Sequence, residues 1–279
     1  MKDIAPTLLA SRSSLTPEGA GLARGSPSLR PLPRERTRIK ICGLTREQDV
    51  DAAVAAGADA VGFVLYGPSP RHVTAERAAE LVHRLPPFVT PVLLFVNASA
   101  TEIIAACAHV PCAVVQFHGD ETPEMCLQIA RPFMRAARIP LNEKPANGGG
   151  GFDLVKYVED YKSAQAILLD AHVDGFGGGG KTFNWSLLPP SVNAHLVLSG
   201  GLTPANVGDG ILQVRPRGKT LAVDVSSGVE EQLPNGSPRK GIKSPELISQ
   251  FVAAVRAADL FIANQLAEKA FEHVRVPTT

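Results

Sequence analysis

The chain has 279 residues, 44% of them hydrophobic, so it can bury the core of one large domain or of two small ones. Its 28 lysines and arginines nearly balance 27 acidic residues, which gives no indication of a nucleic-acid or membrane partner. The longest apolar runs, such as 92–96, are far too short to span a bilayer. We therefore expect no nucleic acid and no membrane among its partners, whereas a small anionic substrate stays open because local charge can differ from the total.

The four cysteines, Cys42, Cys107, Cys112 and Cys126, form no CxxC pair and no Cys/His spacing typical of a zinc site. We expect no metal, and reduced thiols in a cytoplasmic protein. Residues 1–37 hold five prolines, five serines and five arginines with little apolar content, which is typical of a disordered extension. Targeting or partner binding is the alternative role for this segment, although it lacks the hydrophobic core of a secretory signal.

From residue 38 onward, short apolar or β-branched runs alternate with helical patterns, and no consecutive hairpins are expected. The eight predicted strands cover 39–42, 60–65, 91–96, 113–118, 135–139, 166–170, 195–199 and 221–225. This α/β alternation predicts a single (β/α)8 TIM barrel of eight parallel strands over residues 38–259. An open doubly wound sheet uses the same alternation, but no GxGxxG follows the first strand.

Helix starts are marked by hydroxyl residues between the strands. The predicted starts are Thr45 with Gln48, Thr74 with Glu76, Thr203 before Pro204, and Ser244 before Pro245. Further helices are predicted over 122–130 and 153–161, with a short, weak one around 185–188. Residues 260–279 are expected to form a C-terminal helical extension or tail beyond the barrel.

Two candidate proton carriers stand at strand ends, which all lie on one face of a parallel barrel. Cys42 ends the first predicted strand and Asp170 the sixth, so one could remove a proton from a small substrate while the other donates one. Lys40 shares the strand face of Cys42, and a nearby cation favours the thiolate. The apolar run before Asp170 would favour its protonated form. A buried apolar thiol and a loop-capping aspartate are the structural alternatives.

Anion-binding groups follow the last two predicted strands. Gly200 and Gly201 leave the backbone bare before a helix start, and Ser226 and Ser227 offer hydroxyls and N–H groups. Loops at these positions of a barrel commonly bind phosphate, although glycine and serine also simply make turns.

Three further polar residues are candidates for substrate contacts. Arg71 can hold a carboxylate or a phosphate through two parallel hydrogen bonds, or be an ordinary surface arginine. His118 and Asp224 are ambiguous in isolation, although an unpartnered carboxylate within an apolar strand would be costly.

Two glycine runs complete the candidates. Residues 177–180, before Lys181, lack the Walker A pattern and suggest a loop that closes over substrate or a linker, and 148–151 suggest a plain loop.

Taken in chain order, eight motifs resemble the phosphoribosylanthranilate isomerase family of the tryptophan pathway. They are KICGLT at 40–45, GADAVGF at 57–63, SPR at 69–71, VQFHGD at 115–120, LLD at 168–170, GGKTFNW at 179–185, LSGGL at 198–202 and VDVSSGVE at 223–230. The resemblance covers about residues 38–259 and implies a TIM barrel that needs no metal and no cofactor, as a monomer or a homodimer. It departs at Asn184, where aspartate is common in the family.

The resemblance also implies a reaction and roles for the residues. N-(5-phosphoribosyl)anthranilate would become 1-(2-carboxyphenylamino)-1-deoxyribulose 5-phosphate by an Amadori rearrangement. Asp170 would be the general acid on the furanose ring oxygen, and Cys42 the general base at C2 of the sugar. The remaining roles would be a carboxylate contact from Arg71, substrate contacts from Asp224 and His118, and phosphate contacts from Gly200, Gly201, Ser226 and Ser227.

Other phosphate-binding barrels are the competing interpretations. The aminoaldose isomerase of the histidine pathway places aspartate at the end of its first strand, and indoleglycerol-phosphate synthase relies on catalytic lysines, so Cys42 argues against both. A non-catalytic barrel that binds a sugar phosphate would keep the phosphate loops but could lose Cys42 or Asp170, and both are present.

Overall fold

The computed structural model describes residues 36–141, 152–171 and 182–274, with side-chain surroundings given up to residue 269. Almost all of the predicted N-terminal extension lies outside these ranges, and so do both glycine runs. No helix within the described ranges is both long and apolar enough to cross a membrane.

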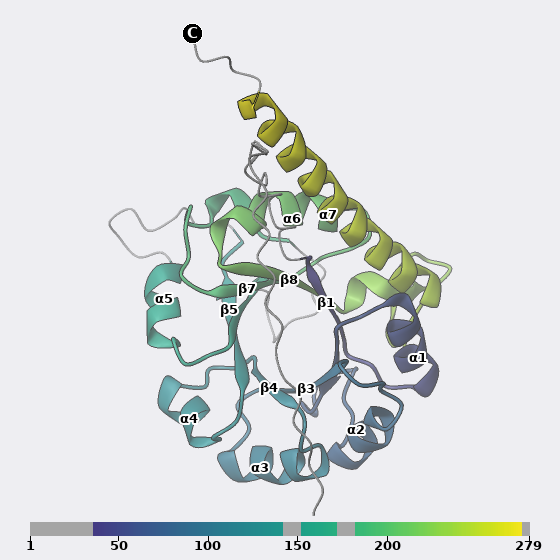
Figure 1. Ribbon diagram of the computed structural model, residues 1–279. Coiled ribbons are helices and arrows are strands. Elements are labelled where there is room, and N and C mark those ends of the chain that lie inside the picture. Colours follow the sequence, from purple (N-terminus) through teal and green to yellow (C-terminus); the bar gives the residue numbers. More distant parts are fainter. Residues whose placement is uncertain (1–35, 142–151, 172–181, 275–279) are drawn as a thin grey trace, which may run out of the picture. The chain divides into compact units, whose positions relative to one another are not determined.

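Eight parallel strands close into a barrel in which each strand pairs with its neighbours in sequence and β1 pairs with β8 (Figure 1). The strands are β1 (Arg38–Cys42), β2 (Ala60–Val64), β3 (Thr90–Phe95), β4 (Val114–Phe117), β5 (Phe133–Ile139), β6 (Ala166–Ala171), β7 (His195–Leu198) and β8 (Thr220–Val225). Each overlaps a predicted strand and differs from it by at most two residues at either end. The predicted closed barrel is therefore confirmed, and the open sheet is not formed.

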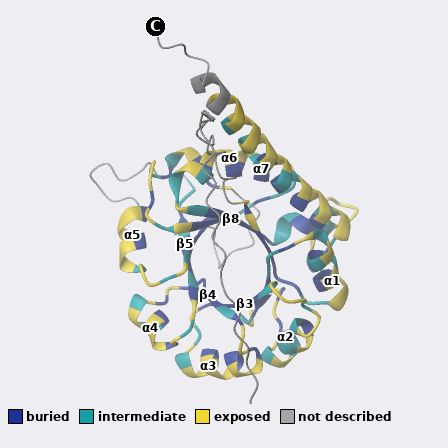
Figure 2. Ribbon diagram, in the orientation of Figure 1, coloured by how far each residue is buried: buried dark blue, intermediate teal, exposed yellow. Residues whose placement is uncertain are grey.

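Helices surround the barrel and turn their buried faces toward it (Figure 2). The described α-helices are α1 (Glu47–Ala56), α2 (Ala75–Val82), α3 (Ala100–His109), α4 (Pro123–Gln128), α5 (Leu154–Asp160), α6 (Val207–Val214) and α7 (Pro245–Val274). Short 3-10 turns cover η1 (Trp185–Leu187), η2 (Arg215–Arg217) and η3 (Ser227–Val229). The weak prediction around 185–188 is thus a single 3-10 turn, capped by Asn184, whose Oδ1 accepts a hydrogen bond from the backbone N–H of Ser186.

The predicted helix starts are right at two positions and wrong at two. Thr74 accepts a hydrogen bond from the N–H of Arg77, and Ser244 accepts one from Leu247, as N-caps do. Thr45 does not cap α1, because its hydroxyl donates to the carbonyl of Gly241 instead. The Thr203–Pro204 pair begins a turn, and α6 begins only at Val207.

Helix α3 and the hairpin that follows β8 were not predicted from the sequence. Helix α3 begins with a complete capping box between Ser99 and Glu102, a signal that the S-x-x-E spacing carries. After β8, an antiparallel hairpin joins β9 (Glu230–Gln232) to β10 (Pro238–Lys243), a single hairpin that the alternation of strands and helices did not predict. Its turn contains the Asn235–Gly236 pair, with Gly236 in the left-handed region at φ 77°, where glycine is favoured.

At both predicted ends of the barrel domain, residues 38 and 259, the ordered chain continues beyond the predicted boundary. Thr37, placed by the sequence in the extension, is fully buried, and its N–H and hydroxyl donate to Asp259 on α7. Helix α7 packs against α1 and α6 and continues past residue 259, where Leu260 and Phe261 are exposed.

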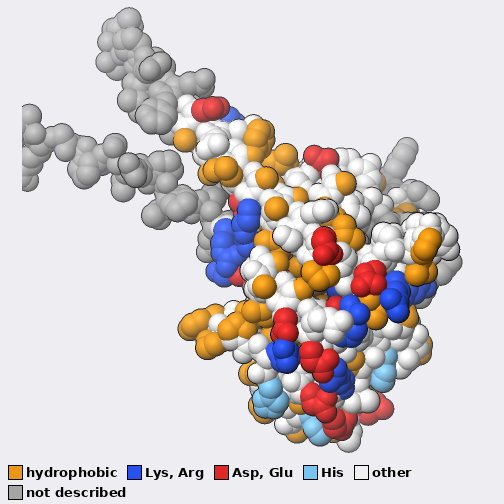
Figure 3. Space-filling model, turned by 90° about the vertical axis from the view of Figure 1, so that its right-hand side faces the viewer, with side chains coloured by type: hydrophobic (Ala, Val, Ile, Leu, Met, Phe, Trp, Pro, Cys, Tyr) orange, Lys and Arg blue, Asp and Glu red, His pale blue; other side chains and the backbone are white. Residues whose placement is uncertain are grey.

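On the face that includes α1 and α2, acidic and basic side chains alternate (Figure 3), as in the pairs Arg84–Asp51 and Arg77–Glu47.

Buried side chains separate into a large cluster that joins strands to helices and two small clusters on the opposite face of the strands, one of which includes Val96 just after β3. One small cluster holds Ala136, Leu168 and Val197. The other joins Cys42 to Val64, Leu94 and Val96, near the carboxyl ends of β1, β2 and β3. Packed strand ends of this kind fix the polar groups beside Cys42 on a rigid frame.

Candidate active site

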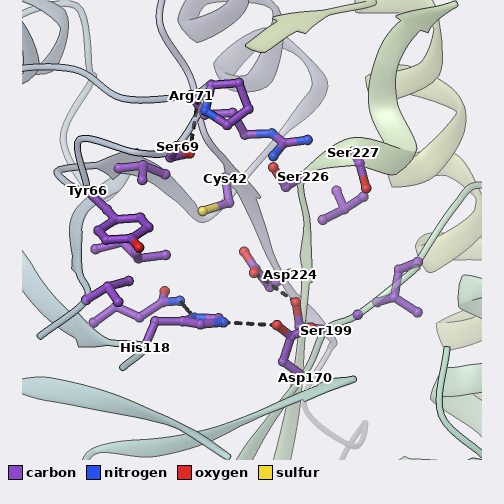
Figure 4. A pocket seen from close by; sticks show the side chains of 18 of the residues that line it. Cys42, Tyr66, Ser69, Arg71, His118, Asp170, Ser199, Asp224, Ser226 and Ser227 are labelled. Carbon is purple, nitrogen blue, oxygen red and sulfur yellow. Dashed lines mark hydrogen bonds and ion pairs between the residues drawn. The ribbon is translucent and has the colours of Figure 1, made fainter. Parts of the chain in front are cut away.

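A pocket of about 280 Å³ opens at the carboxyl ends of the strands (Figure 4). All nine residues predicted as site residues line it: Cys42, Arg71, His118, Asp170, Gly200, Gly201, Asp224, Ser226 and Ser227. These residues come from six separate stretches of the chain, at the ends of β1, β2, β4, β6, β7 and β8, so the closed barrel is what brings them together. Tyr66, Ser69, Gln116 and Ser199 also line the pocket.

The Cys42 side of the pocket contains a buried ion pair. Lys40 and Asp224 are register partners across β1 and β8, and Lys40 Nζ lies 2.7 Å from Asp224 Oδ1. Ser199 donates its hydroxyl to the other carboxylate oxygen at 3.1 Å. The Cys42 and Lys40 side chains share the space over Gly62, where a Cβ would lie 2.7 Å from Cys42 Sγ and 3.0 Å from Lys40 Nζ.

Opposing effects set the protonation of these groups. Burial raises the pKa of the Cys42 thiol and outweighs Lys40, which lowers it. The predicted influence of Lys40 therefore has the expected sign but does not decide the outcome in the free pocket. Burial also acts to lower the pKa of Lys40, but attraction to Asp224 and Cys42 prevails and the pKa ends above its ordinary value. Lys40 is thus a permanent cation beside a thiol.

The Asp170 side of the pocket is a chain of three hydrogen-bonded side chains. Gln116 Nε2 lies 3.0 Å from His118 Nδ1, and His118 Nε2 lies 2.9 Å from Asp170 Oδ2. Because an amide nitrogen can only donate, Nδ1 accepts and the imidazole proton of a neutral His118 sits on Nε2, facing Asp170. Gln116 Oε1 is buried and has no hydrogen-bond partner within the described residues.

Gly200 lies against the same carboxylate. Its φ is +76°, and a Cβ there would lie 2.6 Å from the backbone nitrogen of Ala171 and 2.8 Å from Asp170 Oδ1. Both the backbone conformation and the close approach require glycine. Gly201 follows with φ 65°, and its carbonyl accepts a hydrogen bond from Asn206 Nδ2. The predicted phosphate loop therefore also forms one wall of the Asp170 site.

Arg71 is held by a carboxylate that the sequence did not suggest as a site residue. Its Nε and Nη2 donate to the two oxygens of Glu230 at 2.7 and 2.9 Å. Burial acts to raise the pKa of Glu230, but Arg71 and Lys243 prevail and the pKa lies below its ordinary range. Arg71 Nη1 has no hydrogen-bond partner among the described residues. Glu230 therefore orients Arg71 and leaves its Nη1 available to donate to a substrate.

Lys243 joins this cluster from the end of β10. Its Nζ donates to the Ser226 carbonyl at 2.8 Å and lies 3.3 Å from Glu230 Oε1 and from Ser226 Oγ. Glu230 and Lys243 were missed as site residues because they meet only through the hairpin. The S-S-G-V-E motif did contain Glu230, and the Asn–Gly pair could have indicated the hairpin.

No cluster of three or more histidine, cysteine or acidic side chains suited to a metal ion occurs in the described part of the chain. In chemical terms, the pocket offers a thiol beside an ammonium, a carboxyl group beside an imidazole, an oriented guanidinium, and a rim of glycine and serine. This set suits proton transfers on a small anionic substrate.

Known proteins of one family match this chain along almost the whole length of the barrel. Residues 39–254 match the family described as N-(5'phosphoribosyl)anthranilate (PRA) isomerase. The N-(5'-phosphoribosyl)anthranilate isomerase of Methylibium petroleiphilum is 57% identical over 228 residues, which cover 82% of this chain and 98% of the relative. That of Leptothrix cholodnii is 58% identical over 224 residues, which cover 80% and 93%.

Solved structures agree. The phosphoribosyl anthranilate isomerase of Thermotoga maritima superimposes with a TM-score of 0.65 at 38% identity, covering 79% of this chain and 99% of that one. A second structure, of the isomerase in complex with reduced 1-(o-carboxyphenylamino)-1-deoxyribulose 5-phosphate, has a TM-score of 0.62 at 35% identity, with the same coverage. The chain belongs to the N-(5'-phosphoribosyl)anthranilate isomerase family.

Proposed function

We propose that Cys42 is the general base and Asp170 the general acid with which this chain converts N-(5'-phosphoribosyl)anthranilate to 1-(2-carboxyphenylamino)-1-deoxyribulose 5-phosphate, in L-tryptophan biosynthesis. The observation that carries the proposal is their placement in one pocket, each beside a partner suited to its task. Lys40 is the cation that a thiolate needs, and His118 Nε2 forms a hydrogen bond with the carboxyl group of Asp170.

The first half-reaction opens the sugar. Asp170 gives a proton to the furanose ring oxygen, the bond from that oxygen to C1 breaks, and the anthranilate nitrogen forms a protonated Schiff base with C1. His118 Nε2–H occupies Oδ2, which leaves Oδ1, the oxygen beside Gly200, to deliver the proton. After transfer, the same hydrogen bond stabilises the carboxylate that forms.

The second half-reaction takes place at C2. The thiolate of Cys42 removes the C2 proton, and the electron pair moves into the C1–C2 bond to neutralise the Schiff base as an enolamine. The enolamine becomes the ketone when C1 gains a proton and the C2 hydroxyl loses one. Burial keeps the pKa of Cys42 raised in the free pocket, whereas Lys40 lowers it. The positive charge of the Schiff base acts in the same direction as Lys40, so the thiolate is favoured when it is needed.

The remaining groups hold the two anionic ends of the substrate. Arg71, oriented by Glu230, contacts the anthranilate carboxylate through the guanidinium edge that Glu230 leaves open. His118 and Asp224 contact the sugar between the two ends. The phosphate is held by Gly200, Gly201, Ser226 and Ser227 at the rim of the pocket.

A fluorescence assay of substrate turnover tests this assignment. We expect the purified wild type to be active, and Cys42→Ser and Asp170→Asn each to lose about two to four orders of magnitude in kcat. Cys112→Ser, which changes an exposed thiol, is the matched control and keeps full activity. An inactive wild type refutes the isomerase activity. Full activity in both variants refutes the two roles but leaves the reaction standing.

Location and assembly are part of the same proposal. The four cysteines are all free, which supports a reducing, cytoplasmic location, and cell fractionation checks it. One related structure shows monomers generated from the dimeric phosphoribosylanthranilate isomerase of Thermotoga maritima. We therefore keep monomer and homodimer as the two candidate states, and light scattering by the purified chain distinguishes them.

A further inference from the structure

Lys243 is a fully buried lysine that contacts Ser226 in the pocket lining and has no place in the proton transfers described above. Its ammonium group contacts Ser226, on the loop proposed to bind phosphate, and Glu230, which orients Arg71. One side chain thus contacts both the loop proposed to bind the phosphate and the carboxylate that orients Arg71, the residue proposed to bind the substrate carboxylate. The Ser226 hydroxyl and the Arg71 stem are also close, since a Cβ at Gly43 would lie 2.6 Å from Arg71 Cδ and 3.1 Å from Ser226 Oγ.

The charge of this cluster is unbalanced. Arg71 and Lys243 contribute two positive charges and Glu230 only one negative charge, in a region where all three side chains are buried. An uncompensated charge in such a place is costly unless something neutralises it. A substrate that carries a phosphate and a carboxylate supplies the missing negative charge.

The protonation of Lys243 reflects the same excess. Burial lowers its pKa to about 8, and Arg71 acts in the same direction, while Glu230 and Cys42 oppose the change. Asp49 and Arg46 on the α1 side contact only its backbone. The free protein therefore holds this lysine close to the pH at which it loses its proton, and a bound anion would keep it charged.

The backbone around Lys243 leaves its side chain little freedom. Its N–H donates to Asp49 at 3.4 Å and its carbonyl accepts from Arg46 at 3.3 Å, so the end of β10 is tied to α1. Two residues earlier, the N–H of Gly241 donates to Glu230 Oε1 at 2.8 Å. The hairpin therefore delivers the lysine and fixes the carboxylate together.

We propose that Lys243 is a positioning residue that holds the Ser226 loop and the Arg71–Glu230 pair at a fixed spacing and charge, so that the pocket selects substrates with a phosphate at one end and a carboxylate at the other. This inference rests on the proposed function. It assigns to the hairpin, which lies after the last barrel strand, the task of joining the two anion sites.

The test uses Lys243→Met, which keeps the length of the side chain but removes the charge and the donors. We expect KM to rise about tenfold to a hundredfold while kcat changes less than about threefold, and inhibition by inorganic phosphate to weaken about tenfold. Lys240→Met is the matched control, because Lys240 is exposed on the same hairpin, and it should behave as wild type. Lys243→Arg, which restores the charge, should recover part of the phosphate affinity.

Calorimetric titration with inorganic phosphate gives a readout that does not depend on turnover. Wild-type affinity should weaken several-fold as the pH rises through about 8, and Lys243→Met should lack this dependence. A folded Lys243→Met protein, judged by its melting curve, with wild-type KM and phosphate affinity overturns the inference while the isomerase activity stands. If Lys243→Met does not fold, Lys243→Arg decides: phosphate affinity with no pH dependence near 8 supports the inference, and an unchanged dependence overturns it. An inactive wild type that shows the predicted phosphate binding refutes the isomerase activity and leaves the role of Lys243 in anion binding.

Discussion

The two sides of the pocket are built from different kinds of partner. On the β1–β8 side, Cys42 lies beside a buried Lys40–Asp224 ion pair whose members are both about 5% exposed. On the β4–β6 side, Asp170 faces a neutral donor, His118, which an uncharged amide holds. A base works through its anion and gains from a fixed cation, whereas a fixed cation would keep an acid ionised. The difference in partners thus matches the difference in roles.

Among changes to the partners of Cys42 and Asp170, the largest effect is expected from Lys40→Met, which removes the charge from the Cys42 side. Lys40 lowers the pKa of the thiol, so its removal raises that pKa further and moves the rise of activity with pH to more alkaline values. We expect kcat/KM at neutral pH to fall about a hundredfold. Ultraviolet titration of the thiolate together with the pH profile checks this, and an unchanged thiol titration contradicts it.

Stability complicates that measurement, because Lys40→Met leaves Asp224 buried with Ser199 as its one remaining hydrogen-bond donor among the described residues. Breaking one member of a buried pair costs about 3–5 kcal/mol. The double variant Lys40→Met/Asp224→Asn removes both charges and should regain much of that stability without regaining activity. Denaturant unfolding of the single and double variants separates the two effects.

A matched pair of glycine substitutions tests whether the two sides act independently. Gly62→Ala places a Cβ against Cys42 Sγ and Lys40 Nζ, whereas Gly200→Ala places one against Asp170 Oδ1 and the Ala171 backbone. We expect about tenfold to thirtyfold loss of kcat in each. Only Gly62→Ala should also change the thiol titration. A shift of the thiol titration in Gly200→Ala would show that the sides are coupled.

Gly208→Ala is the control for this pair. Gly208 lies in α6, where an added Cβ meets nothing within 4 Å. Alanine is a better helix former than glycine by about 0.5–1 kcal/mol, so this variant should be active and slightly more stable. Gly200→Ala should instead be less stable, because its left-handed backbone at φ +76° disfavours a side chain.

Whether a feature of the two sides could be predicted from the sequence depends on how far apart in the chain its contacting residues lie. The positions of Cys42 and Asp170 at strand ends were predictable, because local alternation defines the strands and a parallel barrel places their ends together. The pairing of His118 with Asp170 joins residues 52 positions apart and needs the geometry of the closed barrel. The contact of Lys243 with Glu230 depends on a hairpin that was not predicted.

The direction of the Cys42 pKa shift could not be predicted from the sequence either. The sequence shows a lysine two residues before the cysteine, which predicts a lowered pKa, but burial of the thiol is a property of the packed strands and prevails. The position of the partner was therefore predictable, and the balance of opposing effects was not. By contrast, helix α3 could have been predicted, since its capping box is local.

The smallest effect is expected from Gln116→Leu on the Asp170 side. The amide donor keeps the His118 proton on Nε2, and without it the imidazole is free to carry its proton on Nδ1 instead. Nε2 would then accept a hydrogen bond from Oδ2 of the protonated acid, which holds the proton on the wrong oxygen. Losing one hydrogen bond costs a net free energy of about 0.5–1.5 kcal/mol, so kcat should fall about threefold to tenfold.

Nitrogen NMR of the His118 ring, combined with kcat, checks this prediction. Gln128→Leu, at an exposed position of α4, is the control and should leave both unchanged. The stability of Gln116→Leu should stay near that of wild type, because the substitution also removes a buried oxygen that has no partner in the described structure. If the tautomer shifts while kcat does not, the proton of Asp170 is delivered without help from the orientation of His118. The neutral partner would then serve only to keep charge away from the acid.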